Sequence, residues 1–212
     1  MEDDLIFDIV PYLKQKDILS LSSVRKRNCR LLLQLNSAFI GALSYPFSLR
    51  NFRSLVFLDI TFSEEDLPIL VPLSVQHLKI RCDEQIANVS QLTNLLSLDC
   101  NQNNELVDLR KLDQLTGLTI LCNMGIRSLS YLTNLIDLKL YWNRVPDIIK
   151  LTKLESLYLR EDRCITDLST MSNLTSLVLI ENTLIKDISY FTKLNNLQVL
   201  WDRIGIKIPC NI

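Results

Sequence analysis

Residues that could do chemistry are few in this 212-residue sequence, which has one histidine, His77, and six cysteines. A metal site or an activated nucleophile needs such side chains at short, defined spacings, as in CxxC or a Cys–His pair. The cysteines stand at Cys29, Cys82, Cys100, Cys122, Cys164 and Cys210, and none forms a CxxC pair. Nothing in the sequence orients His77 toward a cysteine, or toward a serine and an aspartate, for proton transfer. We therefore predict no catalytic residues, no metal ligands and no cofactor, and expect a protein that is not an enzyme.

Composition and charge exclude further classes of function. A net charge of −1 lacks the broad basic field of nucleic-acid binding, and the four glycines form neither GxGxxG nor GxxxxGK. No apolar run approaches the ~20 residues of a membrane-spanning helix, and the Met-Glu-Asp-Asp start is unlike a secretory signal. We expect no nucleic-acid or membrane partner, and a cytoplasmic location, with a nuclear one left open.

A repeat of about 20 residues organises most of the chain. Its clearest marker is a leucine that recurs at intervals of 20, 20, 19, 20 and 20 residues: Leu98, Leu118, Leu138, Leu157, Leu177 and Leu197. Units such as LTNLLSLDCNQN and LTNLIDLKLYWN fit LxxLxLxxN, and weaker copies stand near residues 55–60 and 75–80. The sequence therefore predicts about eight units over residues 51–212.

The last position of the motif is a short polar residue: Asn103, Asn123, Asn143 and Asn182, with Asp83, Asp162 and Asp202 as substitutes. An asparagine inside a tight turn can bond backbone groups of its own and adjacent units that would otherwise be buried without partners. We therefore predict a ladder of these side chains beside a parallel sheet.

This pattern resembles the leucine-rich repeat family, and its short units are most similar to the phosphatase-regulator and bacterial-internalin branches. The resemblance implies an α/β solenoid with a curved parallel β-sheet and a role in protein–protein interaction. In this register Cys82 and Cys122 lie two strands apart, about 10 Å at about 4.8 Å per strand. A disulfide requires Cα atoms within about 7 Å, so we expect reduced cysteines in a protein that is not secreted.

Residues 1–50 lack the 20-residue period and instead show helical spacing, which predicts two or three short helices. Residues 4–27, DLIFDIVPYLKQKDILSLSSVRKR, resemble an F-box. The resemblance implies binding of the Skp adaptor of a cullin ubiquitin ligase through residues 4–35, with seven apolar side chains at the contact: Leu5, Ile9, Tyr12, Leu13, Ile18, Leu21 and Val24. The alternative is a helical cap that covers the end of the solenoid core.

Residues that alternate with the inward leucines should form the concave face of the sheet. At one end of this face the charges of Asp59, Lys79 and Asp99 alternate and can satisfy one another. The C-terminal half instead gathers residue types that are enriched in interfaces. We name this set the concave cluster and predict that it binds a protein partner: Tyr141, Trp142, Tyr158, Arg160, Val178, Ile180, Leu200 and Trp201.

The C-terminal end has no polar capping helix in its sequence. Ile204, Ile206 and Ile208 alternate as in a further strand, which would form an open parallel edge. We expect either a self-capping turn at Pro209 or self-association through this edge.

Three functions remain open at this point. The first is an F-box substrate receptor, and the second is a structural or scaffold protein of a cellular or viral assembly whose helices only cap the solenoid. The third is a phosphatase-regulator-like binding protein, suggested by the type of repeat alone.

Overall fold

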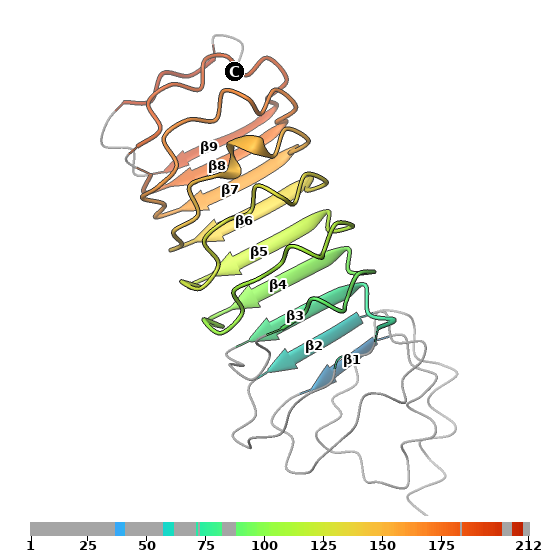
Figure 1. The fold of residues 1–212 in the computed structure, drawn as a ribbon. Coiled ribbons are helices and arrows are strands. Elements are labelled where there is room, and N and C mark those ends of the chain that lie inside the picture. Colours follow the sequence, from blue (N-terminus) through green and yellow to red (C-terminus); the bar gives the residue numbers. More distant parts are fainter. Residues whose placement is uncertain are drawn as a thin grey trace, which may run out of the picture.

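The computed structural model describes residues 37–40, 57–61, 71, 73–81, 88–182, 184–200 and 205–209, and for residues 37–40, 57–61 and 81 it describes the backbone only. Nine strands form one parallel sheet in chain order (Figure 1). They are β1 (Ser37–Ile40), β2 (Phe57–Thr61), β3 (His77–Arg81), β4 (Ser97–Asn101), β5 (Gly117–Leu121), β6 (Asp137–Tyr141), β7 (Ser156–Arg160), β8 (Ser176–Ile180) and β9 (Asn196–Leu200). Loops return on the opposite side, so each repeat unit is one coil of a solenoid.

The register of the sheet follows the leucine repeat. Leu118 pairs with Leu98 on one side and with Leu138 on the other, and Leu138 pairs with Leu157 across the 19-residue unit. The missing residue of that unit falls in its loop, where the 3₁₀ helix η5 (Ile148–Lys150) lies. The predicted spine of stacked leucines is therefore confirmed.

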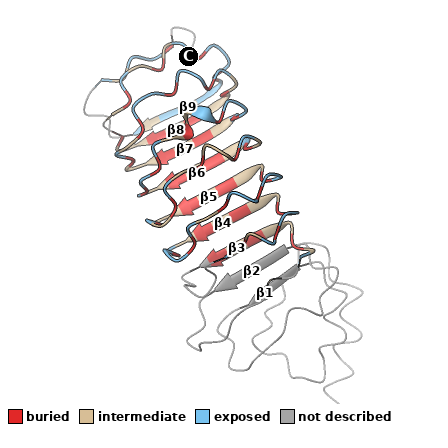
Figure 2. Ribbon diagram, in the orientation of Figure 1, coloured by how far each residue is buried: buried red, intermediate tan, exposed pale blue. Residues whose placement is uncertain are grey.

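The core runs along the inside of the stack. In β4 to β8 the second and fourth residues are buried and their neighbours are partly exposed, which reproduces the alternation of LxL (Figure 2). The loops add further buried leucines to each coil, such as Leu106, Leu109, Leu112 and Leu115 in the coil of β4. Full burial of one such side chain contributes roughly 1.5–3 kcal/mol, so the repeated leucines supply the main stabilisation.

The ladder of short polar residues is present in the described coils, where five members are buried: Asn103, Asn123, Asn143, Asp162 and Asn182. Asn123 shows the pattern in full, because its Oδ1 accepts from the N–H groups of Gly125 at 2.8 Å and Ile126 at 2.9 Å. Its Nδ2 donates to the carbonyl of Leu106 at 3.1 Å and to that of Asn103 in the preceding coil. These bonds satisfy backbone groups that the tight turn leaves without partners.

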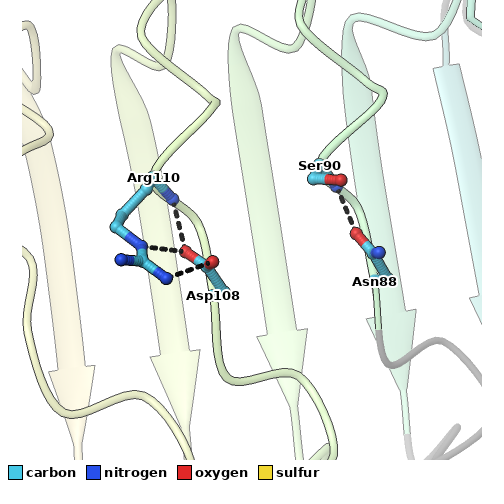
Figure 3. A network of polar contacts seen from close by, with 4 residues as sticks. All are labelled: Asn88, Ser90, Asp108 and Arg110. Carbon is cyan, nitrogen blue, oxygen red and sulfur yellow. Dashed lines mark hydrogen bonds and ion pairs between the residues drawn. The ribbon is translucent and has the colours of Figure 1, made fainter.

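Two further polar columns were not found from the sequence. On the loop side, the side-chain amides of Asn134 and Asn173 donate to carbonyls of the preceding coil, and Lys153 and Lys193 donate to those asparagines at 2.7 Å. A second column caps the loop turns, as in Figure 3, where Asn88 accepts from the backbone N–H of Ser90.

The neighbouring coil repeats this cap with a charged pair. Asp108 accepts from the backbone N–H of Arg110 at 2.9 Å and also from its guanidinium (Figure 3). These hydrogen bonds lower the pKa of Asp108 to about 2. The carboxylate therefore stays ionised across the neutral and mildly acidic range.

The sheet begins earlier than the repeat analysis predicts. We expected helices over residues 1–50, but β1 lies within that range and pairs in parallel with β2. Ala38 stands in register with Leu58, and Ile40 with Ile60, so β1 is one 20-residue period before β2. Alanine at a leucine position hides this unit in the sequence. The other residues of the expected helical segment, 1–36 and 41–50, lie outside the described residues, and all seven F-box-like residues are among them.

The C-terminal segment is not the sheet strand that the alternating isoleucines suggested. Lys207 forms an isolated parallel bridge with Asp187, its equivalent one coil earlier, and the Ile188 N–H donates to the Lys207 carbonyl at 2.8 Å. Residues 205–209 therefore stack as the loop side of the last coil, with Pro209 buried, and the last described strand of the sheet is β9. Ile204 lies outside the described residues. Self-association at this end stays a prediction.

Candidate protein-binding surface

The sheet brings six of the eight residues of the concave cluster onto neighbouring strands and a seventh directly after one of them. Tyr141, Arg160, Ile180 and Leu200 occupy the same register position of β6, β7, β8 and β9. Tyr158 and Val178 pair two residues earlier on β7 and β8, and Trp142 directly follows β6. Trp201 lies outside the described residues. Because strands lie about 4.8 Å apart, these side chains form one continuous surface.

Aromatic contacts organise the centre of this surface. The ring centroids of Tyr141 and Tyr158 are 4.7 Å apart at an interplanar angle of 32°. The guanidinium carbon of Arg160 lies 5.7 Å from the centre of the Trp142 ring, in cation–π range. Burial, followed by the neighbouring Tyr158, raises the pKa of the Tyr141 hydroxyl, so it stays protonated at neutral pH.

The backbone fixes the position of Trp142. This residue adopts a left-handed φ of 47°, and its N–H donates to the carbonyl of Arg160 at 3.2 Å. Gln102, Cys122, Glu161 and Glu181 have the same conformation at equivalent positions. Trp142 nevertheless leaves 43% of its surface exposed, and Leu200 leaves 48%. The cluster thus combines a defined backbone turn with accessible apolar surface.

Charges on the described part of this face are paired. Lys79 lies 3.0 Å from Asp99, which confirms the pairing expected at that end, while the side chain of Asp59 lies outside the described residues. Lys139 lies 3.6 Å from Asp137, and the Nε atom of Arg160 lies 3.6 Å from a carboxylate oxygen of Glu161. Exposed pairs contribute at most about 1 kcal/mol each, so they neutralise the surface more than they stabilise it.

Sequence reasoning did not find Glu161 as the partner of Arg160. The available signal was its place directly before a ladder residue, the position that Trp142 occupies one coil earlier. For Arg160 and Glu161, a shared position in the turn therefore indicates their contact better than the alternation of side chains within the strands does.

The described residues provide little else for chemistry. No three histidine, cysteine, aspartate or glutamate residues among them lie close enough to hold a metal ion. Cys100, Cys122 and Cys164 are free thiols, and burial raises the pKa of Cys100 to about 12. His77 lies in β3, where partial burial lowers its pKa. Within the same part of the chain, no helix has the length and apolar character needed to span a membrane.

Solved structures with the same architecture are leucine-rich repeat proteins. Internalin C2 of Listeria monocytogenes is 21% identical with a TM-score of 0.54, covering 79% of this chain and 80% of its own. The internalin InlF of the same organism is 23% identical with a TM-score of 0.53, and the match covers 80% of this chain and 62% of the InlF chain. A leucine-rich repeat protein of Leptospira interrogans is 20% identical with a TM-score of 0.66, and the match covers 94% of this chain and 58% of the Leptospira chain.

These likenesses define the fold as a leucine-rich repeat solenoid. The chain spans less than two thirds of the length of the InlF and Leptospira structures. No family model matches the sequence, and neither does any curated protein.

Proposed function

We propose that the protein is a non-catalytic protein-binding module and that the concave cluster is its partner site. The observation that carries this proposal is the continuous aromatic and aliphatic surface across β6 to β9, with Trp142 and Leu200 widely exposed. Aromatic residues and arginine dominate the energetic centres of protein interfaces. Because its charges are paired within the chain, this surface favours a partner recognised mainly through apolar and aromatic contacts.

The test replaces two central side chains together, Tyr158→Ala and Arg160→Ala. We expect at least a tenfold loss of specifically captured partner when the immobilised protein is exposed to lysate. The matched control is Lys111→Ala with Arg127→Ala, which removes two exposed cations outside the strands. The melting temperatures of both double variants are measured first, so that a loss of capture is not caused by unfolding. Undiminished capture by the Tyr158/Arg160 variant would contradict the site.

The finer proposal is an F-box substrate receptor that recruits the target to a Skp–cullin ubiquitin ligase. It is supported by the order of residues 4–27 and by their place before the repeats. Substituting Ile9 and Leu13 by glutamate should abolish co-elution with purified Skp adaptor, because both are expected at the apolar contact. The Tyr158/Arg160 double variant should still co-elute. Absence of wild-type co-elution would eliminate the receptor.

The alternative is a scaffold protein that uses the same cluster without a ligase. The strand β9 supports it, because its residues are more exposed than those of the inner strands and, among the described residues, it pairs with β8 alone. An unpaired strand edge can pair with another chain. A phosphatase-regulator-like role is suggested by the repeat type alone, and a phosphatase captured by the wild type but not by the double variant would support it.

A further inference from the structure

Asp162 places an ionisable group in the buried polar ladder beside the concave cluster. The residue has 0% of its surface exposed. Its Oδ1 accepts from the backbone N–H groups of Cys164 at 3.0 Å and Ile165 at 2.7 Å. Its Oδ2 is buried and has no hydrogen-bond partner in the described part of the chain. A buried carboxylate oxygen without a partner carries a large desolvation penalty.

Asn123 shows one arrangement of this position of the ladder. There the second polar atom is a nitrogen, which donates to the carbonyls of Leu106 and of Asn103 in the preceding coil. In Asp162 the corresponding atom is an oxygen, which donates a hydrogen bond only when the carboxyl group is protonated. In the two flanking coils the Nδ2 atoms of Asn143 and Asn182 are buried and have no hydrogen-bond partner among the described residues, so this position accepts a neutral group without a second bond. The neutral acid therefore matches asparagine, whereas the charged carboxylate does not.

No charged group near Asp162 offsets the ionised form. The preceding coil contributes Asn143 and the exposed Arg144, and the following coil contributes Glu181 and Asn182. Within its own turn, Glu161 is paired with Arg160, and Arg163 is exposed. Burial raises the pKa of Asp162 against the opposing effect of two backbone N–H groups, and no charge contributes to that shift.

The turn that Asp162 holds also positions the cluster. Glu161, directly before it, has a left-handed φ of 52° and donates its N–H to the carbonyl of Ile180 at 2.9 Å. Arg160 accepts from the Trp142 N–H through its carbonyl and lies over the Trp142 ring through its guanidinium. Asp162 therefore lies two residues from Arg160, whose guanidinium makes the cation–π contact.

We propose that Asp162 is a proton-dependent switch: its neutral form fits the buried ladder as asparagine does and holds Arg160 and Glu161 in place, and its ionisation loosens their turn. The idea that this switch regulates partner binding rests on the proposed function. Its conformational effect, however, is measured on the isolated protein. A failure of the switch and a failure of partner binding are therefore separate results.

The sign of the stability effect follows from the raised folded-state pKa. The contribution of Asp162 is fully present below the ordinary pKa of 3.8 and is lost as pH rises through the folded-state pKa. Asp162→Asn keeps a neutral side chain at every pH. This variant should therefore melt at a higher temperature than wild type at pH 7, with the difference disappearing near pH 3.

The direct test follows two NMR signals on the full chain, the Asp162 carboxyl carbon and the Arg160 Nε–H group. We expect Asp162 to titrate at higher pH than Asp187, whose pKa is lowered by hydrogen bonds from Ser189. The Arg160 signal should shift with the Asp162 midpoint in wild type and in the control Asp187→Asn, and this shift should be lost in Asp162→Asn.

Two results would overturn the switch. One is titration of wild-type Asp162 together with or below Asp187, which needs no variant to be folded. The other is an Arg160 transition that survives in Asp162→Asn.

Discussion

Single residues show how closely one coil packs against the next. A Cβ atom added at Gly125 would lie 2.3 Å from the carbonyl oxygen of Asn104 and 2.8 Å from Cγ1 of Val107, both in the preceding coil. At Gly117, in β5, the same atom would lie 3.5 Å from the Ser97 hydroxyl, an ordinary contact. Two glycines eight positions apart therefore tolerate a methyl group very differently.

These glycines form a matched pair of substitutions. Gly125→Ala should reduce the free energy of unfolding by about 1–3 kcal/mol, because a backbone carbonyl must move to admit the methyl group. Gly117→Ala should be neutral or stabilising by up to about 1 kcal/mol, because alanine restricts the unfolded chain without a clash. Urea unfolding measures both, and a larger loss at Gly117 would contradict the packing of the coils.

At the scale of the strands, the sequence predicted the features that recur in every repeat unit, namely the register of the strands and the alternation of their side chains. Spacing of the leucines placed β2 to β9 in register, and alternation within each strand identified which side chains face outward. Tyr141, Tyr158 and Arg160 could thus be grouped from the sequence alone. This succeeded because each strand is only five residues long and each coil is fixed by its neighbours.

The strands and turns that were missed depart from the repeat or depend on local geometry. β1 escaped because Ala38 replaces the leucine that marks the other strands. The contact between Arg160 and Glu161 depends on a left-handed turn, which the spacing of apolar residues does not encode. The capping bond of Asp108 to Arg110 depends on side-chain reach within one loop. Periodicity therefore predicts the positions of residues well and their polar partners poorly.

At the scale of the whole molecule, position along the solenoid determines how well each coil is stabilised. Inner strands such as β6 have neighbours on both sides, and their inward residues are fully buried. β9 pairs with β8 on one side, and its inward residues Leu197 and Val199 are only partly buried (Figure 2). Because each coil contacts only its neighbours, stability should decrease toward this end.

Leu138 and Leu197 test this gradient, because both occupy the first inward position of a strand. Leu138→Ala should reduce the free energy of unfolding by about 2–5 kcal/mol, since it opens a cavity in a fully buried site. Leu197→Ala should cost roughly half as much or less, because its side chain already meets solvent in the native state. Urea unfolding measures both losses at low and high protein concentration. Equal losses at the two positions would contradict an open end, and equality only at high concentration would indicate that a second chain covers β9.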